Sequence, residues 1–117
     1  KPEDEESKRL TFSQAATGAS GIETLLSLSL ELYHNGSVKL ETIIQALTSN
    51  PAKILKINKG NLSVGNDADL CMVDLDKPWI VKKVNLVSKS KNTSIEDKKL
   101  QGKVTNTFVK GKELFKI

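Results

Sequence analysis

The apolar residues of this chain change their spacing near residue 59, and that change limits the possible folds more than any other feature. Before it, apolar residues recur every three or four positions, as at Leu40, Ile43 and Leu47, which predicts helices. After it they form short runs and alternations, which predict strands, and Lys110–Gly111–Lys112 between two such stretches predicts a hairpin turn. Helices followed by strands are typical of the α+β class, or of the junction between two domains.

The stretch from Ile22 to Tyr33 predicts a helix that is apolar on nearly all sides. Ser20 precedes Glu23 by three residues, a spacing that allows a capping box, in which each side chain satisfies a free backbone N–H. His-Asn-Gly at 34–36 is expected to end the helix, because glycine suits the left-handed position after the last turn. A helix with so few polar faces needs cover that a chain of 117 residues can barely supply.

Two shorter helices are expected next. The first runs from about residue 39 to residue 47, and the second starts where Thr48 to Pro51 break the pattern. Asn50 can cap this second helix, and Pro51 fits the first helical position, where its missing N–H costs nothing.

The expected strands cover residues 70–75, 79–81, 103–109 and 113–117, and residues 84–87 are a further strand candidate. The first is an apolar run that we expect to be buried, so that Cys71 within it would behave as an inert small hydrophobe. Lys77–Pro78 is expected to turn the chain between the first two strands, and the polar stretch 88–99 to form a long loop.

The chain offers few groups for covalent or metal chemistry. Its one cysteine excludes an internal disulfide and a thiolate cluster, and its one histidine, His34, stands at a helix end without an HxH or HExxH pattern. The chain is also shorter than the roughly 200 residues that a complete (β/α)₈ barrel needs. We therefore expect no catalytic residue and no metal ligand in it.

The net charge of +4 is unevenly distributed. Residues 1–76 carry seven basic and eleven acidic side chains, whereas residues 77–117 carry eleven lysines and three acids. Arg9 is the only arginine and aromatic residues are scarce, so the basic half predicts a solvated lysine surface rather than nucleic-acid binding. Neither a membrane span nor a secretory leader is visible, and a cytoplasmic location is expected.

Four stretches of the sequence resemble the bacterial dihydroorotases of the amidohydrolase superfamily. Residues 4–24, ending in Gly-Ile-Glu-Thr, resemble the segment after the last barrel strand of these enzymes. Leu47-Thr-Ser-Asn-Pro-Ala-Lys-Ile-Leu55 resembles their LT-x-NPA-x-IL helix boundary, and residues 60–70 resemble the G-x-L-x-x-G-x-x-ADL return into their small β-domain. Ser-Lys-Ser-Lys-Asn-Thr at 88–93 and the G-x-V-x-x-T-x-V-x-G pattern at 102–111 resemble their C-terminal region, so the resemblance covers essentially the whole chain.

The resemblance implies a protein of two parts. One is a (β/α)₈ metal-dependent hydrolase barrel with zinc, which interconverts N-carbamoyl-L-aspartate and dihydroorotate in pyrimidine biosynthesis. The other is a small β-sandwich assembled from both ends of the chain. On this basis residues 1–58 are expected to be the C-terminal helical part of the barrel, starting with the loop after strand 8, and residues 59–117 strands of the composite domain.

The resemblance also implies where the site residues lie. The family's metal ligands and its general-base aspartate, in a Ser-Asp-His-Ala-Pro motif, all precede Lys1–Pro2, which aligns with the Ala-Pro of that motif. The positions carried over to the substrate side are Thr17–Gly18, where the family has Phe-Gly, and Glu3, where it often has His or Gln. Without a metal-bound hydroxide nothing attacks the ring amide, so the chain alone is expected to bind no zinc and to be inactive.

Six positions depart from the family's usual residues. Where the family usually has proline, this chain has Thr11, Ser27 and Ser94. Where the family usually has glycine it has Lys56 and Asp97, and where the family has phenylalanine it has Ile95. Because proline and glycine fix particular backbone angles, their loss suggests a relaxed constraint. The alternative to an enzyme segment is therefore a non-catalytic relic, or a structural partner of aspartate transcarbamoylase. Either way, the unpartnered apolar faces predict a homo-oligomer or association with an N-terminal portion.

Overall fold

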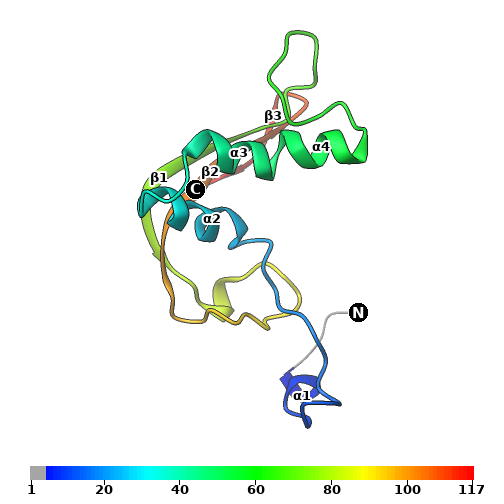
Figure 1. Ribbon diagram of the computed structural model, residues 1–117, viewed down its shortest axis with the longest axis vertical. Coiled ribbons are helices and arrows are strands. Elements are labelled where there is room, and N and C mark those ends of the chain that lie inside the picture. Colours follow the sequence, from blue (N-terminus) through cyan, green and yellow to red (C-terminus); the bar gives the residue numbers. More distant parts are fainter. Residues whose placement is uncertain (1–4) are drawn as a thin grey trace.

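The computed structural model describes residues 5–117, and its elements follow the expected order of helices first and strands second (Figure 1). The helices are α1 (Glu5–Lys8), α2 (Leu25–His34), α3 (Leu40–Leu47) and α4 (Ser49–Leu55). The strands are β1 (Leu70–Ile80), β2 (Lys99–Val109) and β3 (Lys112–Lys116), with a 3₁₀ turn, η1 (Lys83–Asn85), between β1 and β2. The α+β organisation is thus confirmed for the described residues.

The three strands form one antiparallel sheet in the order β1-β2-β3. The hairpin between β2 and β3 has the two-residue turn that the sequence predicts, since Lys110 and Gly111 both have positive φ, at 49° and 77°. The expected turn at Lys77–Pro78 is wrong, because β1 continues through both residues. Asp74 pairs with Lys103 and Pro78 with Gln101, so the proline lies at a bulge, where a missing N–H is tolerated.

Helix α2 packs on the sheet at the bulge between β1 and β2. Leu30 is fully buried there, and its Cδ1 would lie 2.3 Å from a Cβ placed on Gly102. Gly102 also has a φ of +93°. Both the close approach and the backbone angle require glycine at this position. The sequence of β2 therefore determines how closely α2 approaches the sheet.

Strand β1 is covered on one face only. Its exposure alternates from Val73 onwards: Val73, Leu75, Lys77 and Trp79 are half-buried, and the residues between them are exposed. The expectation of a buried strand is therefore wrong, and so is that of a buried Cys71, which is exposed. An apolar run cannot by itself distinguish a strand covered on both faces from one covered on a single face.

Two helix starts differ from the expected ones. Helix α2 begins at Leu25 after Thr24, which makes no side-chain cap hydrogen bond, so the capping box of Ser20 and Glu23 is wrong. Helix α4 begins at Ser49, which places Pro51 at its third position instead of its first. Proline is still tolerated there because the first-turn N–H groups have no partner within the helix.

The molecule is extended, with dimensions of 52 × 31 × 28 Å. Its radius of gyration is 16.5 Å, against about 13 Å for a compact domain of this length. The buried apolar residues are Leu30, Ile43, Ala52, Val81, Leu86 and Leu100. Within residues 5–117, no helix combines the length and apolarity that crossing a membrane requires.

Candidate functional site

The loop between α1 and α2 contains Thr17 and Gly18, the two described residues for which a substrate contact was expected. The loop is tied to α1 at its start, where the Ala16 N–H donates to the Ser7 carbonyl at 2.9 Å. The Lys8 ammonium donates to two carbonyls of the loop, that of Ala16 at 2.7 Å and that of Gly18 at 2.5 Å. Thr17 and Gly18 themselves are exposed. Glu3 lies outside the described residues.

Gly18 is required by the shape of this loop. Its φ is +86°, and a Cβ placed on it would meet no atom within 4 Å. The requirement is therefore the left-handed backbone angle and not a shortage of space. The glycine of the expected Thr17–Gly18 pair is thus explained by local conformation.

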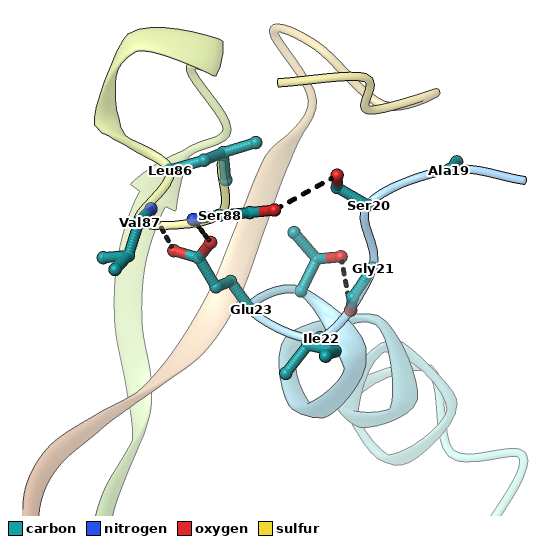
Figure 2. A pocket seen from close by; sticks show the side chains of 9 residues that line it. Ala19, Ser20, Gly21, Ile22, Glu23, Leu86, Val87 and Ser88 are labelled. Atoms are coloured by element: carbon teal, nitrogen blue, oxygen red, sulfur yellow. Dashed lines mark hydrogen bonds between the residues drawn. The ribbon is translucent and has the colours of Figure 1, made fainter. Parts of the chain in front are cut away.

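The far end of the loop is tied to the segment 86–92, which precedes β2 (Figure 2). The Glu23 carboxylate accepts hydrogen bonds from the N–H groups of Val87 at 3.0 Å and Ser88 at 2.9 Å. The Ser20 N–H donates to the Asn92 carbonyl at 2.6 Å, and its hydroxyl donates to the Ser90 carbonyl at 2.9 Å. The two side chains of the expected capping box therefore join two loops that are more than 60 residues apart in sequence.

A pocket of about 370 Å³ lies between these two segments. It is lined by residues 19–24 and by Leu86, Val87 and Ser88 (Figure 2). Thr17 and Gly18 do not line it, although they directly precede its first lining residue, Ala19. Ile22 is 94% exposed beside it, so one apolar residue of the expected helix stands in solvent before that helix begins. Sequence reasoning missed this pocket because its two walls meet only in the folded chain.

The lining of this pocket offers backbone groups, hydroxyls and one carboxylate, that of Glu23. No three His, Cys, Asp or Glu residues in the range 5–117 are grouped so that they could hold a metal ion. His34 is exposed at the end of α2, and Cys71 is exposed on β1. The described residues therefore do not fit a metal centre, and Thr17 and Gly18 offer a ligand only backbone groups and one hydroxyl.

A second polar cluster joins the loop before β1 to the β2–β3 hairpin. The Lys59 ammonium contacts the carboxylates of Asp67 at 2.7 Å and Asp69 at 2.6 Å. The other oxygen of Asp69 accepts the Lys110 N–H at 2.8 Å. The hydrogen bond from Lys59, followed by that from Lys110, lowers the pKa of Asp69, while the two aspartates raise the pKa of Lys59. These groups satisfy one another, which is typical of a structural clamp.

Comparisons with known proteins agree on one family. A sequence profile of the amidohydrolase family matches residues 9–114. Dihydroorotase from Ehrlichia chaffeensis is 43% identical over 115 residues, which cover 98% of this chain and 26% of that protein. Dihydroorotase from the Wolbachia of Drosophila simulans is 43% identical over 114 residues, covering 97% and 26%. The chain thus spans about a quarter of the length of these relatives.

Solved structures support the same fold. The L-hydantoinase (dihydropyrimidinase) of Arthrobacter aurescens superposes with a TM-score of 0.84 at 32% sequence identity, covering 89% of this chain and 24% of that one. A D-hydantoinase superposes with a TM-score of 0.85 at 23% identity, which establishes likeness of fold alone. The arrangement of helices and sheet described above therefore recurs within larger hydrolases.

Proposed function

The chain belongs to the amidohydrolase family, and we propose that it is the C-terminal segment of a dihydroorotase that interconverts N-carbamoyl-L-aspartate and dihydroorotate. The observation that carries the proposal is the unbroken similarity to the Ehrlichia dihydroorotase, at 43% identity over 98% of this chain. The hydantoinases that share its fold also have cyclic amides as their substrate class, so the family-level chemistry is hydrolysis of a cyclic amide.

Within the proposed enzyme, residues 1–58 complete the barrel with the loop after strand 8 and helices α2 to α4, and residues 59–117 belong to a small β-sandwich. The packing of Leu30 against Gly102 joins the two parts, because the first residue lies on α2 and the second on β2. The segment would thus fix the orientation of the composite domain relative to the barrel.

The proposed role at the active site is to present the loop around Thr17 and Gly18 to the substrate, with Glu3 nearby. The loop is suited to this role because it is exposed, lacks a reactive group and is held at both ends. The zinc and its ligands would belong to other parts of the enzyme, since the described residues do not fit a metal centre. The chain alone is therefore proposed to be inactive.

A hybrid enzyme tests this proposal. In the Ehrlichia chaffeensis dihydroorotase, the region that matches this chain is replaced by residues 1–117. We expect the hybrid enzyme to form dihydroorotate from N-carbamoyl-L-aspartate, and we expect neither the isolated chain nor the relative without its matching region to do so. A folded hybrid enzyme that hydrolyses hydantoin or dihydropyrimidine but not dihydroorotate would contradict the proposed substrate. Turnover by the isolated chain after metal removal and re-addition would contradict its inactivity.

The alternative function is a non-catalytic module, such as a structural partner of aspartate transcarbamoylase. The non-glycine residues at Lys56 and Asp97 are the observation that favours it, because both adopt left-handed φ values, of 55° and 64°. An inactive but folded hybrid enzyme that binds aspartate transcarbamoylase in a pull-down would support the alternative.

A further inference from the structure

Lys8 donates its hydrogen bonds to backbone carbonyls rather than to a carboxylate. Its side chain leaves the four-residue helix α1 and donates to the carbonyls of Ala16 and Gly18, which lie eight and ten residues further along the chain. Lys8 is half-buried, so the ammonium replaces part of its hydration with these two contacts. A hydrogen bond from a charged donor is stronger than a neutral one, so Lys8 holds this part of the loop more firmly than a neutral donor would.

The direction of these carbonyls decides where the loop's N–H groups point. No peptide bond in the described chain is cis, and in a trans peptide the C=O and the N–H point in opposite directions. Because Lys8 draws the carbonyls of Ala16 and Gly18 toward itself, the N–H groups of Thr17 and Ala19 face away from it. Neither N–H donates to an acceptor within residues 5–117.

The other hydrogen bonds of the loop hold its two ends, and only Lys8 contacts its centre. The Ala16 N–H is held by Ser7, and the Ser20 N–H is held by Asn92. Between these two anchors, Gly18 has the freest backbone, since glycine loses more conformational entropy on ordering than any other residue. Within the part of the chain that the structure describes, the hydrogen bond from Lys8 is the one that holds Gly18.

We propose that Lys8 is a positioning residue of the dihydroorotase reaction: it orients the 16–19 loop so that the N–H groups of Thr17 and Ala19 face the substrate. This inference rests on the proposed function and adds to it the group that holds the loop in shape. The substrate carries a carboxylate and ring carbonyls, which are acceptors that such N–H groups can bind. Lys8 does not itself touch the reacting atoms.

The test compares three variants in the hybrid enzyme. Lys8→Met keeps the length of the side chain but removes its donors, and Lys8→Arg retains donors that can reach two carbonyls. Lys59→Met is the matched control, because Lys59 also bridges two acceptors but lies in the cluster with Asp67 and Asp69. For each variant we would measure kcat, KM for dihydroorotate and hydrogen exchange of the Thr17 and Ala19 amides.

We expect Lys8→Met to raise KM about tenfold, the factor that ~1.4 kcal/mol of lost binding represents, and to change kcat much less. With dihydroorotate bound, amide exchange at Thr17 and Ala19 should be faster in Lys8→Met than in the parent, because the two N–H groups would no longer face the substrate. Lys8→Arg should recover most of the loss, and Lys59→Met should leave KM unchanged. An unaltered KM in Lys8→Met, or an equal rise of KM in Lys59→Met, would overturn the inference about Lys8. The proposed function would still stand in that case, provided that the parent hybrid enzyme is active. An inactive parent would instead count against the proposed function itself.

Discussion

Ser27 connects three elements through a single hydroxyl. It lies buried in the first turn of α2 and donates to the Gly102 carbonyl of β2 at 2.6 Å. The indole Nε1–H of Trp79, on β1, donates to the same hydroxyl and to the Gly102 carbonyl, each at 3.2 Å. Ser27 is therefore a polar contact between α2 and the sheet.

Ser27→Ala should consequently weaken the packing of α2 on the sheet. The change removes the donor to the buried Gly102 carbonyl, and we expect a loss of about 1–2 kcal/mol, because Trp79 still satisfies part of that oxygen. The measurement is native-state hydrogen exchange of the α2 and β2 amides in the hybrid enzyme. Ser29→Ala is the control, since its hydroxyl donates only to the Leu25 carbonyl of its own helix. Equal effects of the two changes would contradict the role given to Ser27.

Lys56 carries a local strain that glycine would relieve. It caps the C-terminus of α4 with φ 55° and ψ 38°, a conformation that costs a residue with a Cβ about 1–2 kcal/mol. Lys56→Gly should stabilise α4 by about 0.5–1 kcal/mol, because this relief exceeds the greater entropy of glycine in the unfolded chain.

Slower hydrogen exchange of the α4 amides in the hybrid enzyme would verify this effect. Lys53→Gly, inside the same helix, is the matched control and should instead accelerate exchange, because interior glycine disfavours a helix by about 1 kcal/mol. Destabilisation by both changes would show that the left-handed angle of Lys56 carries no strain.

At the scale of elements, spacing rules predicted the helices and the hairpin well. The periodicity at Leu40, Ile43 and Leu47 predicted α3 to within one residue, and Lys110–Gly111 fixed the register between β2 and β3. These elements depend on neighbours in sequence, which is why local patterns suffice. The expected turn at Lys77–Pro78 failed because the proline lies at a bulge of β1, where residues 75–77 stand opposite Gly102 alone on β2, and local sequence does not reveal this pairing.

The candidate site was predictable only in part for the same reason. The resemblance assigned Thr17 and Gly18 to the substrate side, which stays a prediction, and the structure explains only the glycine, through its left-handed φ. Ser20 and Glu23 matched a local capping pattern, but their partners lie in the segment 86–92. A pattern within four residues cannot reveal hydrogen-bond partners more than 60 residues away, and Ser20 and Glu23 bond to such distant partners instead of to each other's backbone.

The clamp between the loop before β1 and the hairpin predicts a dependence on pH. The pKa of Asp69 is lowered in the folded protein, so its contribution to stability is present above the ordinary carboxyl pKa of 3.8 and is lost as the pH falls through its folded value. We expect hydrogen exchange of the Lys110 amide, which donates to Asp69, to accelerate on acidification beyond the intrinsic pH effect. In Asp69→Asn this additional acceleration should disappear, whereas Asp76→Asn should retain it. The same acceleration in Asp69→Asn would show that Asp69 is not its source.

At the scale of the whole molecule, the surface is too large for the chain's mass. The accessible area is 8,824 Å², whereas a folded monomer of 12.8 kDa has about 6,300 Å². Much of the difference is apolar, since the exposed residues include Phe12, Ile22, Val64, Val84 and Val87. Helix α2 illustrates the cause: Leu30 is buried against the sheet, while Leu25 on the same helix remains 54% exposed. The sheet and α3 thus cover only part of the apolar surface of α2, as its composition led us to expect.

This surface predicts that the isolated chain self-associates. Apolar faces of α2 and the open edges of β1 and β3 remain available for contacts between copies, and such faces and edges associate unless they are covered. Light scattering of the isolated chain should give a mass well above 12.8 kDa that rises with concentration. Co-expression with the Ehrlichia chaffeensis dihydroorotase lacking its matching region should suppress this rise, because the same faces would then contact the rest of the enzyme. A stable monomer at high concentration would show that the exposed faces need no partner, and would weaken the interpretation of the chain as a segment of a larger hydrolase.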